Sequence, residues 1–173
     1  MESLRISMVA VCTMIAALAL TAEDKLGSDS WKIPSDKKNF HVFLLMGQSN
    51  MSGGAGIAVG DTQPTPHVMR MCYTKEGSEP KWAPGAHPLH PRRPNKKKRF
   101  GPGISFAQTY AGDKPHVVVG LIPMAWGGRS IDQLNKGSGI YKDAIRHARA
   151  SMQVGTLKGV LWHQGESDTV EQA

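Results

Sequence analysis

Short apolar runs recur along the chain, separated by polar or glycine-rich segments. The runs at residues 40–46, 68–73, 116–122 and 157–162 have the length and the Val, Leu, Phe or Met content of buried strands. Gly47 bounds the first run and Pro123 ends the third. The pattern therefore predicts four strands.

Two of the intervening segments have the pattern of helices instead. Residues 103–111 are followed by Gly112, which is typical of a helix end. Residues 141–152 are expected to form an amphipathic helix, whose apolar face would comprise Tyr141, Ala144, Ile145, Ala148 and Met152. Because strands and helices alternate, we expect an α/β fold: a three-layer α/β/α sandwich with a mainly parallel sheet.

The connecting segments differ in character. Residues 47–60 are rich in glycine and predict a loop with room for a short helix. Residues 74–102 are rich in proline, glycine and charge, and a loop of this length is usually functional.

The first 22 residues have the pattern of a secretory signal peptide. Arg5 precedes an apolar stretch of about 15 residues, and Ala22 precedes a polar segment. A membrane anchor is the alternative, but a span needs roughly 20 apolar residues. We therefore divide the chain into a signal peptide (1–22), a polar leader (23–39) and one domain (40–173), and expect a secreted or periplasmic protein.

The cysteine content and the net charge limit which nucleophiles and which partners fit the sequence. Cys12 would leave with the signal peptide, and Cys72 lies within a strand pattern, which favours a buried structural thiol over a nucleophile. The net charge is +7, and much of it comes from a run at residues 92–99. A solvated loop is favoured there, and an export signal argues against nucleic acid as a partner.

Three of the predicted strands end in unusual polar or glycine-rich sequence. Gly47-Gln48-Ser49-Asn50 follows the first, residues 125–130 follow the third, and residues 163–168 follow the fourth. Ligands of layered α/β folds gather at the carboxyl ends of strands, so these segments could converge on one site.

Each segment offers a group useful in ester hydrolysis. A serine on a tight turn, here Ser49, can be exposed to substrate beside backbone N–H groups. Gly127-Gly128 permits close approach of the backbone to a ligand. His163, Gln164 and Glu166 supply an imidazole, an amide and a carboxylate. An ordinary turn or strand cap would explain any one of these alone, but three together favour a hydrolytic site.

In combination, these segments resemble the sialate O-acetylesterase and acetylxylan esterase group of the SGNH hydrolases. The resemblance covers residues 42–168 and rests on LMGQSNMSG at 45–53, PLH at 88–90, FGPGISFA at 100–107, GLIP at 120–123, WGGRSI at 126–131 and WHQGESD at 162–168. It implies a flavodoxin-like fold, an acetylated carbohydrate as substrate, and neither a cofactor nor a metal.

The resemblance also implies roles for particular residues. Ser49 would be the nucleophile, and Glu166 could orient the base. The N–H groups of Ser49 and Gly128, with the Gln164 amide, would form the oxyanion hole. Further residues expected to line the site are Gln48, Asn50, Gly127 and His163.

The family's base is a histidine in a late Asp-x-x-His segment, and no histidine follows Glu166 in these 173 residues. We therefore expect a truncated domain with feeble activity at most, because a serine hydroxyl needs a base. One alternative is a carbohydrate-binding remnant without catalysis. Another is a metal site formed by His87, His90 and His163, which we disfavour. The sequence leaves the identity of the sugar open.

Overall fold

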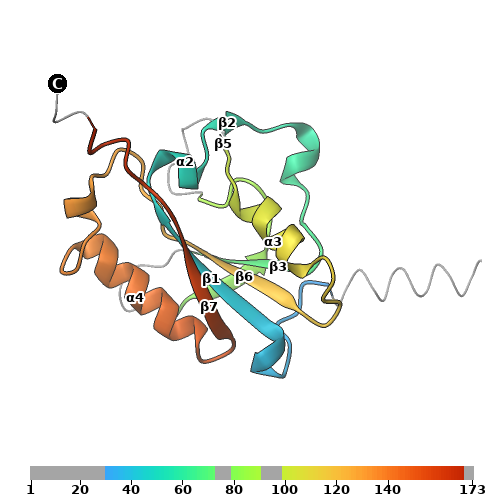
Figure 1. The fold of residues 1–173 in the computed structure, drawn as a ribbon. Helices are drawn as coiled ribbons and strands as arrows, with labels where there is room; N and C mark the ends of the chain where they lie inside the picture. Colours follow the sequence, from blue (N-terminus) through green and yellow to red (C-terminus); the bar gives the residue numbers. More distant parts are fainter. Residues whose placement is uncertain (1–29, 73–78, 91–98, 170–173) are drawn as a thin grey trace, which may run out of the picture.

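The computed structural model describes residues 30–72, 79–90 and 99–169. They form an α/β fold (Figure 1). Its elements, in chain order, are η1 (Lys37–Asn39), β1 (Phe40–Gly47), α2 (Ser49–Ser52), β2 (Ala55–Gly56), η2 (Val59–Thr62), β3 (Val68–Cys72), β4 (Lys81–Pro84), β5 (Arg99–Phe100), α3 (Gly103–Ala111), β6 (Val118–Pro123), η3 (Ile131–Gln133), α4 (Gly139–Ser151) and β7 (Thr156–His163).

The main sheet has five strands in the order β4-β3-β6-β1-β7. Strand β1 pairs in parallel with β6 and with β7, and β3 pairs in parallel with β6. Strand β4 is antiparallel to β3 and lies at one edge. The mainly parallel sheet predicted from the alternation of strands and helices is confirmed. Strands β2 and β5 form a separate antiparallel pair.

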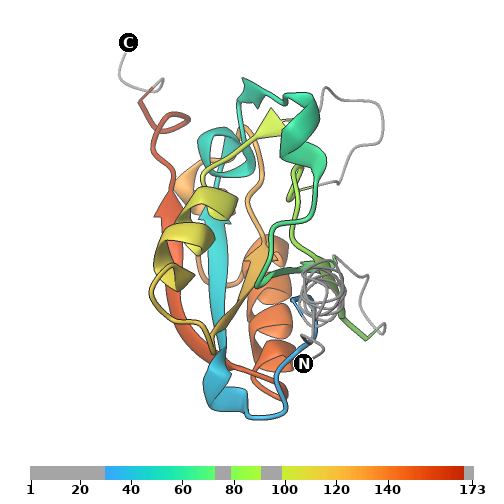
Figure 2. The same cartoon turned by 90° about the vertical axis from the view of Figure 1, so that its right-hand side faces the viewer.

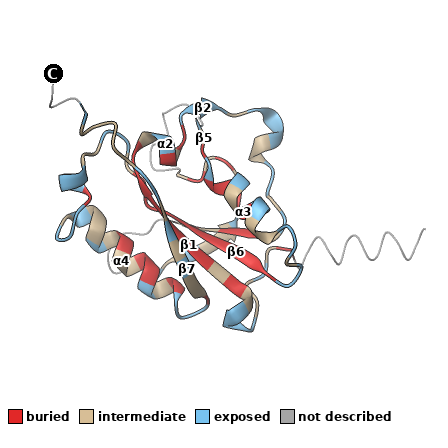
Figure 3. Cartoon of the chain, viewed as in Figure 1, coloured by how far each residue is buried: buried red, intermediate tan, exposed pale blue. Residues whose placement is uncertain are grey.

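Helices α3 and α4 cover opposite faces of the sheet (Figure 2). Successive side chains of β1 point to opposite faces because a strand repeats every two residues. Leu44 and Met46 share a core with Ala144 and Ala148 of α4, and lie on that face. Phe43 and Leu45 lie on the other face, in a core to which α3 contributes Ile104 and Ala107. This double burial explains the nearly continuous apolar sequence of β1 (Figure 3).

Strand β7 is as long as β1 but lies at the other edge of the sheet. Its Leu161 packs against the core on the α3 side. Val160 is 54% exposed and Trp162 45% exposed. The strand therefore brings its carboxyl end beside that of β1 while leaving apolar surface open to solvent.

All four predicted strands and both predicted helices are present, with shifts of one or two residues at their ends. Three short strands were not predicted: β2 lies in the glycine-rich segment at residues 47–60, and β4 and β5 lie in the segment at residues 74–102 that was taken as a loop. Residues 73–78 and 91–98, with most of the basic run, lie outside the described residues, as do the predicted signal peptide and the start of the leader. Cys72 is half-buried rather than buried.

The buried face of α4 differs from the predicted one. Met152 is 50% exposed, whereas His147 and Ser151 are buried beside Ala144 and Ala148. His147 is accommodated because its Nδ1 bonds to the carbonyl of Asp143 at 2.8 Å, one helical turn back. A buried polar side chain that bonds its own helix gives no apolar signal in the sequence.

The described part of the predicted leader packs on the domain. The indole of Trp31 donates to the carbonyl of Thr65 at 3.0 Å, and Trp31 and Ile33 contact the core on the α4 side. His67 donates its backbone N–H to Ser30 at 3.0 Å. No helix within residues 30–72, 79–90 and 99–169 is long and apolar enough to cross a membrane.

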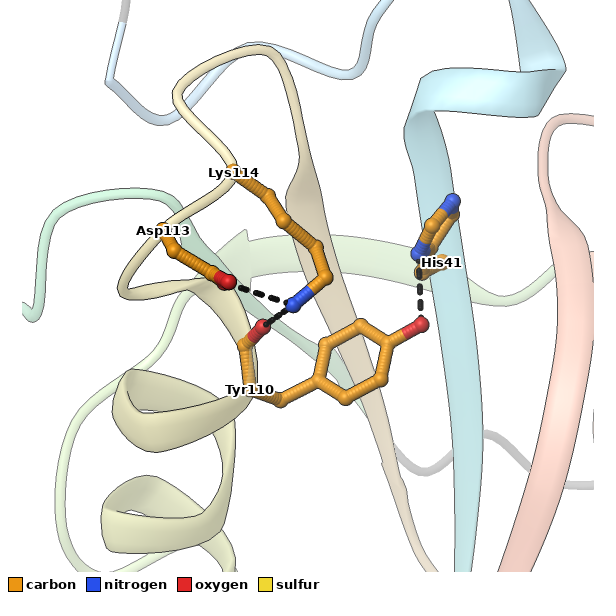
Figure 4. A network of polar contacts seen from close by, with 4 residues as sticks. All are labelled: His41, Tyr110, Asp113 and Lys114. Carbon is orange, nitrogen blue, oxygen red and sulfur yellow. Dashed lines mark hydrogen bonds and ion pairs between the residues drawn. The ribbon is translucent and has the colours of Figure 1, made fainter.

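A polar network lies at the amino end of β1 (Figure 4). The Tyr110 hydroxyl and His41 Nδ1 are 2.9 Å apart, and His41 Nε2 lies 2.8 Å from the carbonyl of Lys38. Lys114 Nζ donates to the Tyr110 carbonyl at 2.8 Å and to Asp113 at 2.7 Å. Burial lowers the pKa of His41, more than its bond to Lys38 raises it. The Lys114 ammonium lowers the pKa of Asp113.

Candidate active site at the carboxyl ends of β6, β1 and β7

The three polar segments predicted from the sequence follow three adjacent strands. Strand β1 lies between β6 and β7, and all three run in the same direction. Backbone hydrogen bonds continue past the strand ends. Met124 N–H donates to Leu45 and Trp126 N–H to Gly47, both at 2.9 Å, and Gln48 N–H donates to His163 at 3.0 Å. Ser49, Gly127 and Glu166 are thus brought to one edge of the sheet, the upper edge in Figure 1.

Gly47 makes the turn after β1 possible. Its φ is +132°, a region that L side chains rarely adopt. A Cβ at this position would lie 1.9 Å from the carbonyl oxygen of His163. The chain can therefore turn from β1 into α2 while staying against β7 only if glycine stands here.

Ser49 is the first residue of α2 and is half-buried. Met51, in the same short helix, is buried in the core on the α3 side and anchors the turn. The Ser49 carbonyl accepts from the Gly53 N–H at 2.8 Å and from the Ser52 hydroxyl at 3.1 Å. Within the described residues, the Ser49 hydroxyl itself makes no hydrogen bond. It is therefore available to a ligand.

The glycine pair after β6 faces Ser49 through its first member. A Cβ at Gly127 would lie 3.8 Å from the Ser49 Cβ, so the backbone of Gly127 is in the neighbourhood of the serine. Gly128 has φ +70° and open space where a side chain would stand. Both residues are exposed. The loop thus exposes backbone beside the serine, as an oxyanion hole requires.

Glu166 is bonded to the residue that follows Ser49. The Asn50 side-chain amide donates to Glu166 Oε1. The other carboxylate oxygen, Oε2, is buried and has no hydrogen-bond partner in the described part of the chain. A buried carboxylate oxygen without a donor is costly, so Glu166 is suited to receive an N–H or O–H from a further group.

Gln164 and Asp168 connect the β7 loop to the glycine loop. Gln164 Nε2 donates to the carbonyl of Arg129 at 3.3 Å and to Asp168 Oδ2. The Ile131 N–H lies 3.0 Å from Oδ1 and 3.2 Å from Oδ2 of Asp168. No role for Asp168 was predicted from the sequence. The available signal was a carboxylate four residues after an amide within one strand-end segment.

Gln48 and His163 differ in exposure, although both were expected to line the site. Gln48 is 3% exposed, and its side-chain carbonyl accepts from the Ser167 N–H at 3.3 Å. It therefore supports the loop after β7 from within the protein and does not line an open surface. His163 is exposed and lies in register with Gly47 at the end of β7.

The alternative metal site is not assembled. No group of three His, Cys, Asp or Glu side chains able to hold an ion occurs among the residues that the structure describes. His87 is buried and packs on the Phe100 ring, with the ring centroids 4.2 Å apart. Burial lowers the pKa of His87, and this effect exceeds the opposing influence of Asp61.

The family is decided by a sequence comparison. The family model described as carbohydrate esterase, sialic acid-specific acetylesterase, matches residues 39–173. The chain belongs to this family. The carbohydrate esterase family predicted from the strand-end segments is thereby confirmed.

Relatives of the carbohydrate esterase family agree with this result. A probable carbohydrate esterase of Arabidopsis thaliana is 29% identical over 163 residues, which cover 84% of this chain and 61% of the relative. Its crystal structure superposes with a TM-score of 0.63, covering 76% of this chain and 59% of the other. The chain thus spans about 61% of the relative's length.

A more distant structure shows the fold alone. NanS is 20% identical, and its structure matches with a TM-score of 0.51 over 79% of this chain and 56% of that chain. The predicted α/β class with a mainly parallel sheet is confirmed by this likeness and by the topology of the sheet.

Proposed function

We propose that the protein is an exported carbohydrate O-acetylesterase that uses Ser49 as its nucleophile. Membership of the carbohydrate esterase family supports an acetyl ester of a glycan as the substrate. The Ser49 oxygen attacks the acetyl carbonyl while its proton passes to a base. The base then returns this proton to the departing sugar oxygen, so that the sugar leaves as its free hydroxyl. Water then cleaves the acetyl-serine ester, releasing acetate and restoring the serine hydroxyl.

The oxyanion formed in each step is stabilised by N–H groups around Ser49. The Ser49 N–H and the Gly128 N–H are the backbone donors, and Gln164 contributes its side-chain amide. The exposed backbone of Gly127-Gly128 beside Ser49 supports this assignment. Such donors lower the barrier because they meet the charge as it develops.

The position of Glu166 carries the proposal. It is tied to the turn of Ser49 through Asn50, and its Oε2 is buried without a donor among the described residues. A histidine whose other ring nitrogen faced the serine would donate its N–H to this oxygen, which would fix its tautomer and stabilise the imidazolium. Glu166 is therefore proposed to orient the base.

Trapping of the acetyl-enzyme tests the mechanism. The full chain is mixed with p-nitrophenyl acetate, quenched in acid, and digested for mass spectrometry. We expect an acetyl group on the peptide that contains Ser49, and none on that peptide in Ser49→Ala. Ser52→Ala, three residues away, should leave the label in place. Acetylation elsewhere and not on Ser49 would reject this nucleophile.

Added imidazole tests the role of Glu166. Imidazole that occupies the position of the base should raise the hydrolysis of p-nitrophenyl acetate in a Ser49-dependent manner. Glu166→Gln should abolish most of this gain, because the amide has only one acceptor oxygen and Asn50 already needs it. A gain that is equal in Glu166→Gln and in the unmodified chain contradicts the role.

Export and substrate are further parts of the proposal. The N-terminal pattern supports cleavage after Ala22, so N-terminal sequencing of the protein from the native cell envelope or medium should begin near Glu23. Acetate release from acetylated xylan and from O-acetylated sialic acid would identify the sugar.

A carbohydrate-binding role without catalysis is the second candidate. It is favoured by the absence, among the described residues, of a histidine ring bonded to the Ser49 hydroxyl. Calorimetric titration of an acetylated oligosaccharide distinguishes the two candidates. Binding that survives in Ser49→Ala, together with no acetylation of the unmodified chain, supports this second role.

A further inference from the structure

Asp168 has two hydrogen-bonding partners that belong to different parts of the site. Its carboxylate accepts the Ile131 N–H, at 3.0 Å to Oδ1 and 3.2 Å to Oδ2. Its Oδ2 also accepts from the Gln164 side-chain amide. Ile131 ends the segment that begins with the glycine pair beside Ser49, and Gln164 follows β7. One carboxylate thus joins two strand ends.

The chemistry of the acceptors fixes which way the Gln164 amide points. A carboxylate only accepts hydrogen bonds, and so does the Arg129 carbonyl. Both lie within reach of the same atom of Gln164, its Nε2. If the amide turned by half a rotation, its oxygen would face two other oxygens. The NH2 group must therefore point toward the glycine loop.

The β7 loop gives Asp168 a firm support. The Asp168 N–H donates to the Gly165 carbonyl at 3.0 Å, which closes a tight turn, and the Ser167 N–H is held by the buried Gln48. Both hydrogens of the Gln164 amide are engaged, one at Asp168 and one at Arg129 at 3.3 Å. The longer of these bonds is the one that an incoming oxyanion can replace.

We propose that Asp168 is a positioning residue that fixes the amide orientation of Gln164 and ties it to the glycine loop beside Ser49. The inference rests on the proposed function, in which Gln164 is an oxyanion donor, and extends it to a residue that does not touch the substrate. Asp168 acts on the reaction through Gln164.

Asp168→Asn is the decisive change because it preserves size and removes one acceptor. If the introduced amide turns its oxygen toward Ile131, its NH2 group meets the Gln164 amide, donor against donor, and Gln164 must turn. If it turns its oxygen toward Gln164, its NH2 group meets the Ile131 N–H and the tie to the glycine loop is broken. We expect Gln164 to lose its fixed place in either case. Asp132→Asn is the matched control. Asp132 is exposed and lies next to Ile131 in η3, and its substitution removes the same negative charge.

The first measurement needs no catalysis. The side-chain NH2 protons of Gln164 in the full chain are observed by NMR and assigned from their loss in Gln164→Ala. We expect slow exchange with solvent in the unmodified chain and in Asp132→Asn, and fast exchange with a changed shift in Asp168→Asn. Protons that exchange alike in all three proteins would overturn the proposal.

The second measurement is a double-mutant cycle on kcat/KM for p-nitrophenyl acetate, with imidazole added. Asp168→Asn should lower kcat about tenfold with little change in KM, since an oxyanion donor acts in the transition state. In the Gln164→Ala background the same change should cost less than about twofold. Equal costs in both backgrounds would mean that Asp168 is only structural.

The two arms separate this inference from the proposed function. If Ser49→Ala hydrolyses the ester as fast as the unmodified chain, the proposed function fails and the NMR arm alone decides the orientation of Gln164. If hydrolysis depends on Ser49 but the cycle is additive, the proposed function stands and the role of Asp168 is rejected.

Discussion

The two ends of strand β1 are both polar but are built differently. At the amino end, His41, Tyr110 and Lys114 bond to one another and to nearby backbone (Figure 4). At the carboxyl end, side chains from three loops bond across separations of 35 to 119 residues.

The difference lies in what remains unpaired. Both ring nitrogens of His41 have partners at the amino end. At the carboxyl end, one oxygen of Glu166 and the hydroxyl of Ser49 have none among the described residues. Satisfied polar groups stabilise a fold, whereas unsatisfied groups held by a rigid frame are suited to bind and react. Changes at the two ends should therefore separate activity from stability.

Removal of the Ser49 hydroxyl should have the largest effect on activity. With imidazole added as the base, we expect Ser49→Ala to remove nearly all of the imidazole-dependent gain in p-nitrophenyl acetate hydrolysis, because the hydroxyl that the base activates is gone. The free energy of unfolding should change by less than about 0.5 kcal/mol, because the hydroxyl makes no bond in the described structure. The free energy of unfolding is measured by urea denaturation. Activity within a few-fold of the unmodified chain would contradict the assignment.

Gly47 links the site to stability and should show the largest effect on folding. Gly47→Ala places a Cβ 1.9 Å from the His163 carbonyl and strains a backbone with φ +132°. The cost should be about 2–4 kcal/mol in urea unfolding. Gly128→Ala is the control, because its φ is also positive but the space is open. It should cost about 1 kcal/mol. Equal costs would show that the contact with β7 is unimportant.

The sequence was most informative where burial dictates composition. Strands β1 and β6 are buried in the centre of the sheet and have continuous apolar sequence. Strand β4 was missed because it is an edge strand, half-exposed, with Lys81 at its start and Pro84 at its end. An edge strand with proline gives little apolar signal.

The location of the site could be predicted from the sequence, but its hydrogen bonds could not. Parallel strands put their carboxyl ends at one edge, so the three polar segments could be expected to meet. The bond from Asp168 to Ile131 depends on the path of two loops, which no periodicity encodes. The same holds for Gln48, whose buried amide supports the β7 loop.

At the amino end, loss of the Tyr110 hydroxyl should affect stability alone. Tyr110→Phe leaves His41 Nδ1 without its donor, and a lost half-buried hydrogen bond costs about 1 kcal/mol. Hydrolysis of p-nitrophenyl acetate should be unchanged. Tyr141→Phe is a suitable control, since Tyr141 is also half-buried and its hydroxyl makes no bond in the described structure. A fall in activity in Tyr110→Phe would show that the two ends are coupled.

The smallest expected effect is a pH dependence of stability at the amino end. His41 Nε2 faces the Lys38 carbonyl, so it carries the proton, and Nδ1 of the neutral ring accepts from Tyr110. Burial lowers the pKa of His41 in the folded state, while the unfolded chain keeps a value near 6.5. Below about pH 6.5 the unfolded state therefore binds more protons, and the free energy of unfolding falls as the pH falls. Above that pH, His41 should contribute no further change to the free energy of unfolding.

Urea unfolding at pH 5.5 and pH 7.5 measures this contribution. The difference in the free energy of unfolding between the two pH values should be smaller in His41→Asn than in the unmodified chain. Buried His87, whose pKa is also lowered, should account for part of the remaining difference. A larger pH dependence in His41→Asn would reverse the sign assigned to His41.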